Sequence, residues 1–556
     1  MKLSALLISN FKGIDKQIKV LIDNIVILVG PNNHCKSTIL DAYEAYVSMG
    51  SDKLTIDHFF GRKNIKPVVI TGVFTDISED DKNKIGQEWV LENDSEFGNC
   101  AKFEVRWSSP GIAGEKYSFS SEIDDWKPGG GGGWNSILQS RLPIPIRLNP
   151  NDGYEALEKV VKDLVSKSTV KKMQDDNSSV SGIVAEIEKL AQQVDKEVSI
   201  SVEQISSKIE NELNKLFKGA EVSFETGVGK FKPEEAIKDG SKFFIKTGEY
   251  ASSLEHQGTG VQRAFLWSAI SALCSEGKLK KGTRTIEEAK SKVLLIDEPE
   301  INLHPSLIRA ARKAIYSLAE VDGWQIICTT HSPLFVDLTQ DHTTLTRISS
   351  KQKSIFYFQT DKAQFSVDEK ENLKMLNRCC PTVNEFFFYD NSLLVEGDTE
   401  YLTYNYLIEK SDLESHYCVI NCRGKANIPI FIKIFDQFEA NAIAIHDLDK
   451  KYRKDGNKNA MWAINLKIRE AADKAGGRVT TVVHKPDFEG YYFDESPTKD
   501  KPYTVFSYLK SDDFLSGSKY AKLRLSLKEI IDGSHKGIYS RKSEIEELGQ
   551  SKDIEG

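Results

Sequence analysis

The stretch Leu393–Glu400, Leu-Leu-Val-Glu-Gly-Asp-Thr-Glu, combines a strand, a turn and the start of a helix. The apolar residues before Glu396 predict a short buried strand, and the glycine after it permits a tight turn. A helix is expected next, because Asp398 or Thr399 can cap it and apolar residues follow at helical spacing. Glu396 and Glu400 would then lie close together, as two hard-oxygen ligands for a metal ion. Taken alone, the octet is equally typical of a strand, a turn and two solvated acids.

The composition is that of a multidomain globular protein. The chain has 556 residues and a net charge of −8, and one hydrophobic core rarely spans that length, so two or three domains are expected. No run of 18 apolar residues suggests a membrane span, and the N-terminus turns polar too soon for a signal peptide. The eight cysteines show neither zinc-ligand spacing nor a disulfide pattern, which is typical of reduced thiols in a cytoplasm.

A phosphate-binding loop follows the apolar run Ile25–Val29, which is typical of a buried strand. The loop fits G-x-x-x-x-G-K-[ST], except that Cys35 stands at the second glycine, and a helix to about Tyr46 is expected after it. Lys36 would reach the β and γ oxygens of a nucleotide, and Ser37 would hold Mg²⁺. If the Cys35 position needs φ > 0, its Cβ costs on the order of 1 kcal/mol, so hydrolysis is expected to be slow. The predicted nucleotide contacts in this loop are Gly30, Asn33, Cys35, Lys36, Ser37 and Thr38.

Two later strands end in polar residues that would complete such a site. The strand over residues 293–296 ends in Asp297 and Glu298. The first suits the water shell of a metal ion, and the second suits polarisation of the attacking water. The next strand, over residues 325–329, is followed by His331, a candidate contact to the γ-phosphate.

A helical segment is expected to interrupt this first domain. Residues 151–217 repeat apolar side chains at helical spacing, which is typical of either a packed helical layer or a coiled-coil dimerisation arm. After it, Gln257 and Gly258 form a glycine-rich turn that opens a helix. A helix N-terminus of this kind suits a phosphate, here that of a nucleotide on a second subunit.

Carboxylates also follow two strands downstream of the opening octet. The strand over residues 442–445 leads to Asp447 and Asp449, which alternation along an extended chain would place on one face. The strand over residues 479–483 precedes Lys485 and two more acids. Open α/β sheets place their sites at the carboxyl ends of strands, so three such ends predict a Mg²⁺ or Mn²⁺ site. The predicted metal ligands there are Glu396, Glu400, Asp447, Asp449, Asp487 and Glu489, beside Ser37 and Asp297 in the nucleotide site.

The motifs of the first half resemble the ABC-type ATPase heads of the SMC, RecF and OLD (overcoming lysogenization defect) proteins. The resemblance covers residues 1 to about 345, and Cys35 departs from it. Heads of this type hold ATP between two subunits, which implies a homodimer or a higher oligomer. The matching stretches are Asn10-Phe11-Lys12, the Lys36 loop, the Gln257-Gly258 turn, Asp297-Glu298-Pro299-Glu300 and His331-Ser332-Pro333.

The second half resembles the Toprim domain of OLD proteins. The resemblance rests on residues 395–400, on Arg423-Gly424-Lys425 and on the pair Asp447 and Asp449. The expected fold class is α/β, an ABC/SMC-like ATPase domain with an inserted helical dimerisation arm followed by a Toprim domain. The expected boundaries are 1–345 for the ATPase domain with the arm at 151–217, 346–390 for a linker, 391–500 for the Toprim domain and 501–556 for a C-terminal helical extension.

The resemblance implies an ATP-binding, metal-dependent endonuclease that cuts nucleic acid, with DNA as the expected substrate, by a two-metal mechanism gated by the head. It also implies bacterial antiviral defence, in some systems beside a partner protein or a reverse-transcriptase–RNA complex. One alternative is an ATP-dependent DNA clamp or sensor whose Toprim domain binds without cutting. Another is a strand-passing or primase activity. The catalytic residues implied by the resemblance are Glu396, Glu400, Asp447, Asp449, Glu489 and Lys485, the last as a cation for the developing phosphate charge.

Overall fold

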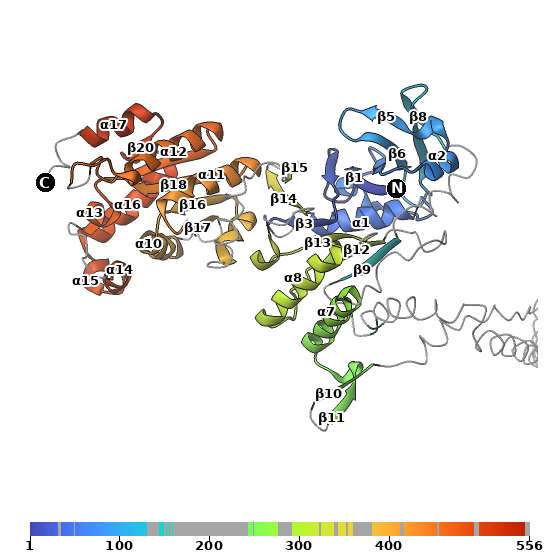
Figure 1. Ribbon diagram of the computed structural model, residues 1–556, viewed down its shortest axis with the longest axis horizontal. Coiled ribbons are helices and arrows are strands. Elements are labelled where there is room, and N and C mark those ends of the chain that lie inside the picture. The colour runs from blue at the N-terminus through green and yellow to red at the C-terminus, as the bar shows by residue number, and fades with distance from the viewer. Residues whose placement is uncertain are drawn as a thin grey trace, which may run out of the picture. The chain divides into compact units, whose positions relative to one another are not determined.

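Figure 1 shows the computed structural model of the chain. It describes residues 1–31, 35–48, 50–129, 144–149, 152, 155, 158, 243–247, 250–275, 292–321, 324–337, 343–351, 354–359, 381–411, 416–452, 455–493 and 500–550. Asn33 and nearly all of the expected arm at 151–217 lie outside the described residues. The chain forms two compact units, one of residues 1–150, 283–301 and 322–556, the other of residues 151–282 and 302–321. None of the described helices is both long and apolar enough to cross a membrane.

The first sheet of the larger unit is antiparallel, in the order β2-β1-β4-β6-β7-β8, with β5 paired to β6. Its alternating strands bury one face against helix α1 (Lys36–Val47), whose Tyr43 and Tyr46 are fully buried in the same core. The strands are β1 (Lys2–Ser9), β2 (Ile18–Leu21), β4 (Val68–Thr75), β5 (Leu91–Asp94), β6 (Gly98–Trp107), β7 (Glu115–Ser120) and β8 (Asp125–Pro128).

The second sheet carries the phosphate-binding loop and has the order β15-β14-β3-β13-β12-β9. All its pairs are parallel except β14 with β15. Parallel strands bury both faces, which explains why every residue of β3 and β13 is buried. The strands are β3 (Ile25–Val29), β9 (Ile144–Leu148), β12 (Lys292–Asp297), β13 (Trp324–Thr329), β14 (Thr343–Lys351) and β15 (Ser354–Gln359).

This sheet corrects one expected boundary. An ATPase domain that ends at residue 345 would cut through β14, which pairs with β3 beside the phosphate-binding loop. The contact is close, because a Cβ on Gly30 would lie 2.1 Å from the carbonyl oxygen of Ile348. The ATPase sheet therefore extends to residue 359, and the expected linker at 346–390 begins too early.

The smaller unit holds the turn that sequence patterns predicted to open a helix. Strands β10 (Phe244–Thr247) and β11 (Tyr250–Ser253) form a hairpin, followed by the 3₁₀ turn η4 (Leu254–His256). Helix α7 (Thr259–Ser275) begins directly after Gly258, as expected, and packs against α8 (Pro305–Ala319).

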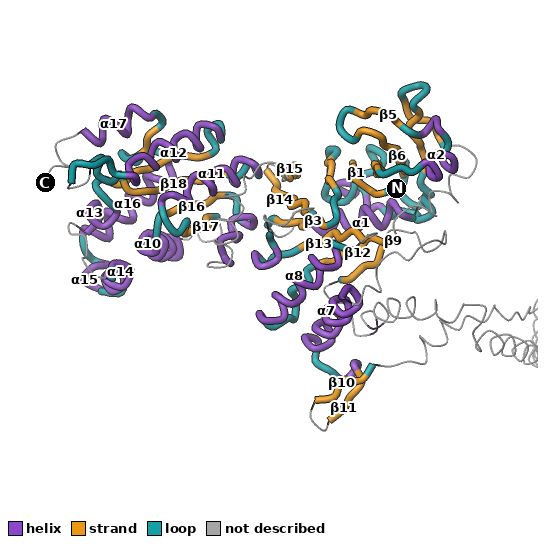
Figure 2. The backbone as a smooth tube through the Cα atoms, viewed as in Figure 1, coloured by secondary structure: helices purple, strands orange, loops and turns teal. Residues whose placement is uncertain are grey.

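The C-terminal sheet has the order β17-β16-β18-β19-β20, with only β20 antiparallel. Figure 2 shows its strands flanked by helices. Its strands are β16 (Asn391–Val395), β17 (Tyr417–Asn421), β18 (Asn441–Asp447), β19 (Val479–His484) and β20 (Ile538–Tyr539). The helices around it are α10 (Asp398–Glu409), α11 (Ile428–Gln437), α12 (Ala460–Lys474), α13 (Phe488–Phe493), α14 (Lys501–Leu509), α15 (Asp512–Leu515), α16 (Ser518–Asp532) and α17 (Lys542–Gln550).

The expected C-terminal extension is an integral part of this domain rather than an appendage. Strand β20 pairs with β19 at the edge of the sheet. Leu523 and Leu527 of α16 and Val505 of α14 are buried in one core with Leu393 and with the buried side chains of α10. The division at residue 500 is therefore wrong, because α14 and α16 pack in the core of the domain and β20 extends its sheet.

Candidate functional site

The phosphate-binding loop ends in a left-handed residue. Cys35 has φ 64° and ψ 22°, directly before α1, so the position that the loop motif gives to glycine does need φ > 0. The ammonium of Lys36 donates to the carbonyl oxygens of Gly30 (3.0 Å) and Pro31 (2.9 Å). Burial lowers the pKa of Lys36 to about 8, against the opposing effect of nearby acids. The lysine thus lies folded against its own loop, where a phosphate group would compete for it.

Asp297, at the end of β12, joins three elements of the head. Its Oδ1 accepts hydrogen bonds from the hydroxyl of Ser37, at 2.9 Å, and from that of Thr329 at the end of β13. The two predicted magnesium residues of the head, Ser37 and Asp297, are therefore brought together from positions 260 residues apart in sequence. Thr38, the next residue of α1, is buried.

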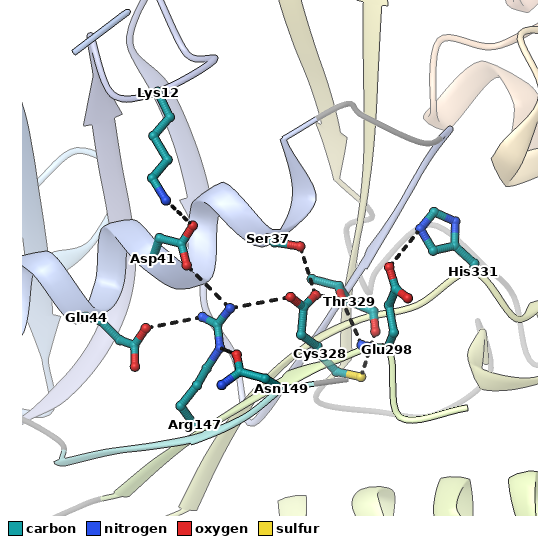
Figure 3. Close-up of polar contacts among 11 residues, drawn as sticks. Lys12, Ser37, Asp41, Glu44, Arg147, Asn149, Glu298, Cys328, Thr329 and His331 are labelled. Carbon is teal, nitrogen blue, oxygen red and sulfur yellow. Dashed lines mark hydrogen bonds and ion pairs between the residues drawn. The ribbon is translucent and has the colours of Figure 1, made fainter. Parts of the chain in front are cut away.

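Arg147 was not predicted from the sequence, yet it lies at the centre of Figure 3. Its guanidinium group lies 3.4 Å from carboxylate oxygens of Asp41, Glu44 and Asp297. Its Nε donates to Asn149 Oδ1 at 2.8 Å. The arginine ties the edge strand β9 to α1 and to the acid of β12, so it holds Asp297 from the side opposite Ser37.

Glu298 and His331, two further predicted residues of the head site, lie side by side. Nε2 of His331 lies 3.4 Å from Oε1 of Glu298. Burial, followed by repulsion from Asp297, raises the pKa of Glu298, while burial and the charge of Lys36 lower that of His331. A neutral imidazole beside a carboxylate of raised pKa suits proton transfer from an attacking water.

Glu300 positions the turn of residues 330–332, called the histidine turn below. It was not among the predicted site residues. Its Oε1 accepts from the backbone N–H of His331 at 2.6 Å, and both its oxygens accept from the hydroxyl of Thr330 at 2.9 Å. The signal was present in the sequence, since Glu300 belongs to the Asp-Glu-Pro-Glu run.

Gln257 and Gly258 lie in the smaller unit, where they form the turn before α7. The backbone oxygen of Gln257 accepts from the amide of Gln262 at 2.9 Å, which fixes the turn to the first part of the helix. Their expected contact with a nucleotide on a second subunit stays a prediction.

The C-terminal domain brings carboxylates from three strand ends together. Oε2 of Glu396, after β16, accepts from the backbone N–H of Asp447 at 3.3 Å. Oδ1 of Asp447, at the end of β18, accepts from the backbone N–H of Phe488 at 2.8 Å. Glu400 on α10 and Glu489 on α13 are both buried. The name acid cluster is used below for Glu396, Glu400, Asp447 and Glu489.

The acid cluster is electrostatically strained. Burial raises the pKa of Glu400 to about 7, and repulsion from Glu396 and Glu489 adds to the shift. Burial and the same neighbouring carboxylates raise the pKa of Asp447 well above its usual range. Repelling carboxylates with hard oxygen donors fit a divalent cation. In the described part of the chain, no three acidic, histidine or cysteine side chains are arranged at metal-binding geometry.

The extended chain from which alternation predicted a shared face for Asp447 and Asp449 ends before Asp449. The strand ends at Asp447, and Asp449 has φ 60°, so the chain turns away before the second acid. Its Oδ2 lies 2.5 Å from the ammonium of Lys425, which also donates to the backbone oxygen of Asp447 at 2.6 Å. Asp449 still contributes repulsion at Glu396. The turn thus gives Asp449 a buried lysine as its partner.

The cap that the sequence predicted for α10 differs from the one in the structure. Neither Asp398 nor Thr399 caps α10, whose N-cap is Gly397 without a side-chain hydrogen bond. Asp398 is not the cap because it is already the first residue of the helix. Its carboxylate instead accepts from Asn421 at 2.7 Å and from Arg423 at 2.9 Å.

The cation found at the acid cluster is one that the sequence did not reveal. The ammonium of Lys501, at the start of α14, lies 3.1 Å from Oε2 of Glu489. Lys485 and Asp487 follow β19, and Oδ1 of Asp487 accepts from the backbone N–H of Gly490 at 2.7 Å. Asp487 also adds to the repulsion at Asp447. The predicted roles of Lys485 and Asp487 stay predictions.

Models of known protein families match both halves of the chain. The family model described as "AAA ATPase domain" matches residues 1–130 and 134–336. The model described as "Overcoming lysogenization defect protein-like, TOPRIM domain" matches residues 387–449.

Three curated relatives carry nuclease names. The OLD nuclease of Thermus scotoductus is 25% identical over 338 residues, which are 58% of this chain and 60% of that protein. The Old nuclease of Escherichia phage P2 is 23% identical over 77% of this chain and 74% of its own length. Endonuclease GajA of Bacillus cereus is 24% identical over 74% of this chain and 69% of its own length.

Among solved structures, an SMC head bound to the C-terminal winged-helix domain of ScpA is 14% identical and covers 65% of this chain and 98% of its own, with a TM-score of 0.35. The ATPase model alone matches more than half of the chain, and the second model gives the type of the C-terminal domain. The chain belongs to the OLD family, with an AAA ATPase domain followed by an OLD-like Toprim domain.

Proposed function

We propose that this protein is a divalent-metal-dependent endonuclease that cuts DNA at the acid cluster under the control of its ATPase domain. The observation that carries the proposal is that four carboxylates lie together at three strand ends, two of them buried and two partly buried. Four acids beside two lysines, Lys425 and Lys501, would be costly to keep charged without a further cation. The nuclease names of the three relatives support the same activity.

The residues at the acid cluster would have two roles, metal binding and contact with the phosphate group. Glu396, Glu400, Asp447 and Glu489 would hold Mg²⁺ or Mn²⁺ ions, with Asp449 and Asp487 as further candidate ligands. Such ions supply an activated water and stabilise the charge on the leaving oxygen. Lys501, half-exposed and already held by Glu489, is placed to meet a phosphate oxygen and balance its developing charge. Lys485 remains the second candidate for that role.

The head would bind Mg·ATP through the loop and the two strand-end acids. Lys36 would exchange the carbonyls of Gly30 and Pro31 for phosphate oxygens, and Ser37 with Asp297 would hold the metal ion. Glu298, oriented beside His331, would take a proton from the attacking water. The strained Cys35 would make the turnover slow.

Control of the nuclease by the head is proposed because both motif sets share one chain. Hydrogen bonds also join the histidine turn to the segment before β16. The side-chain amide of Asn384, in the 3₁₀ segment η7 (Pro381–Phe388), donates to the backbone oxygens of Pro333 (3.2 Å) and Val336 (3.0 Å). A change at His331 on ATP binding would therefore reach β16 and Glu396. ATP-dependent dimer geometry would complete the control.

Family membership extends the proposal to antiviral defence in the bacterial cytoplasm, as a homodimer or higher oligomer. A partner protein or a reverse-transcriptase–RNA complex would belong to the same proposal. The support for the defence role and for these partners is the resemblance to the OLD family.

A plasmid-nicking assay tests the proposed activity. Supercoiled plasmid is incubated with full-length protein and Mg²⁺ or Mn²⁺, with and without ATP. Metal-dependent nicks support an endonuclease. Binding without nicks would favour the DNA clamp or sensor, and a shifted topoisomer ladder without nicks would favour strand passage. Glu409→Gln, an exposed carboxylate on the same helix as Glu400, is the matched control and should cut like the native protein.

A further inference from the structure

Helix α14 exposes aromatic side chains beside the acid cluster. It buries Val505 and Leu509 in the core of the Toprim domain, whereas Tyr503 is 67% exposed and Phe506 is 38% exposed. Positions 503, 506 and 510 are spaced i, i+3 and i+7, so their side chains share one side of the helix. The ammonium of Lys510 lies 4.2 Å from the ring centroid of Phe506. One side of α14 thus presents two rings and a cation to solvent.

Lys501 places the start of this helix at the acid cluster. Lys501 is the first residue of α14, and its ammonium contacts Glu489 of the acid cluster at 3.1 Å. Tyr503 comes two residues later, and Phe506 and Lys510 follow along the helix. Nine helical residues rise about 13 Å, roughly the length of four stacked nucleotides. At about 100° per residue, Tyr503, Phe506 and Lys510 lie on the side of the helix away from Lys501. The exposed rings therefore begin within one helical turn of the acid cluster, and a strand that lies on them would pass around the start of α14 to reach it.

The segment that carries the rings is locally basic. The whole chain has a net charge of −8, but residues 501–528 contain six Lys or Arg residues and two Asp residues. A surface that combines rings with cations is typical of proteins that hold single strands, since rings stack on bases while cations meet the backbone. A double helix keeps its base faces stacked inside, so these rings can reach bases only in unpaired strands.

We propose that Tyr503 and Phe506 form a stacking platform for single-stranded nucleic acid, with Lys510 on its backbone, which guides the strand to the acid cluster. This inference rests on the proposed nuclease and names the form of its substrate, an unpaired strand or a frayed end. The platform would bind bases of any sequence, because every base offers a π-face.

The test measures binding in EDTA, where no metal-dependent cutting can occur. A fluorescein-labelled 12-nucleotide single strand and a duplex of the same sequence are titrated with full-length protein by fluorescence anisotropy. Stacking on one ring contributes on the order of 1–3 kcal/mol per base, so Tyr503→Ala/Phe506→Ala should bind the single strand at least ten times more weakly. Its duplex affinity should change less than twofold.

Two further variants separate stacking from folding and from mere apolar area. Tyr503→Leu/Phe506→Leu keeps apolar side chains and should lose single-strand affinity as the alanine variant does. Tyr508→Ala is the control on the same helix, because Tyr508 is exposed on another side and its ring stacks on Phe493 at 5.8 Å. It should bind the single strand within twofold of the native protein.

The platform is refuted if the folded double variants, checked by circular dichroism, bind the single strand within twofold of the native protein. A changed oligomeric mass with unchanged oligonucleotide affinity would likewise refute it and identify a protein contact. Hydrolysis of bis(4-nitrophenyl) phosphate, a diester without bases, tests the nuclease separately. Its loss in Glu396→Gln would uphold the acid cluster whatever the outcome for α14.

Discussion

The ammonium of Lys425 lies 2.5 Å from Oδ2 of Asp449, and the side chain of Lys425 is fully buried. This pair brings a second positive charge, beside that of Lys501, to the edge of the acid cluster. Lys425 also lowers the pKa of Glu396 against the larger effect of burial. Its contribution is therefore to the stability of the acid cluster before any metal ion binds.

Replacing Lys425 by methionine should destabilise the protein, because Asp449 loses its partner and the cluster loses a compensating charge. The expected decrease in the free energy of unfolding is on the order of 3 kcal/mol, measured by urea denaturation in EDTA. Lys425→Met/Asp449→Asn should recover part of it. An unchanged urea midpoint in the single variant would contradict this role.

Replacing Glu400 by glutamine should have the opposite effect on the metal-free protein. The raised pKa of about 7 means that the folded state binds this proton more tightly than the unfolded state does, so charging Glu400 destabilises the fold. The variant should be more stable than the native protein by on the order of 1–3 kcal/mol at pH 8, and the difference should vanish toward pH 4.5.

Metal titration supplies the control for that variant. Mn²⁺ should raise the melting temperature of the native protein and raise that of Glu400→Gln much less, whereas Glu409→Gln should respond like the native protein. Equal stability of native protein and Glu400→Gln at pH 8 would show that the repulsion is relieved in some other way.

Replacing Cys35 by glycine should raise the rate of ATP hydrolysis. The residue has φ 64°, a conformation that costs a residue with a Cβ on the order of 1 kcal/mol and costs glycine almost nothing. Cys35→Ala keeps the Cβ and should stay slow, which separates backbone strain from the bulk of the thiol. The rate of phosphate release at saturating ATP measures the effect, and no increase in the glycine variant would show that the loop tolerates the thiol.

Replacing Glu298 by glutamine should preserve ATP binding and slow hydrolysis by about 10²-fold or more, since the group that accepts the water's proton is lost. Binding is measured with a fluorescent ATP analogue and hydrolysis by phosphate release. Similar hydrolysis in variant and native protein would assign the base to another residue.

Local sequence patterns predicted the parts of both sites that depend on neighbouring residues. The strand, loop and helix around Lys36 and the strand that ends at Asp297 are continuous motifs, so the chain itself signals them. The ends of parallel strands then brought Glu396 and Asp447 together, as the general property of open sheets predicts.

Contacts set by tertiary structure were beyond the sequence. Alternation gives no sign that Asp449 turns into a left-handed conformation, or that Lys425 fills the space beside it. Arg147 lies within the proline-containing strand β9, which carries no motif, and its three carboxylate partners come from two distant elements.

The sequence of the C-terminal helices does carry a sign that they pack in the domain. Leu523, Leu527 and Ile530 are spaced i, i+4 and i+7, the period of a helix with one buried side. Polar residues around these three side chains make the helical period hard to recognise, so the composition alone predicts a separate extension.

The most direct test of the account compares plasmid nicking by native protein with that by Glu396→Ala and Asp447→Ala, in Mn²⁺ with ATP. ATP binding is measured on the same preparations. The account predicts that both variants bind ATP like the native protein and lose nicking by at least 10²-fold. Nicking at the native rate by either variant would show that the acid cluster is not the nuclease site.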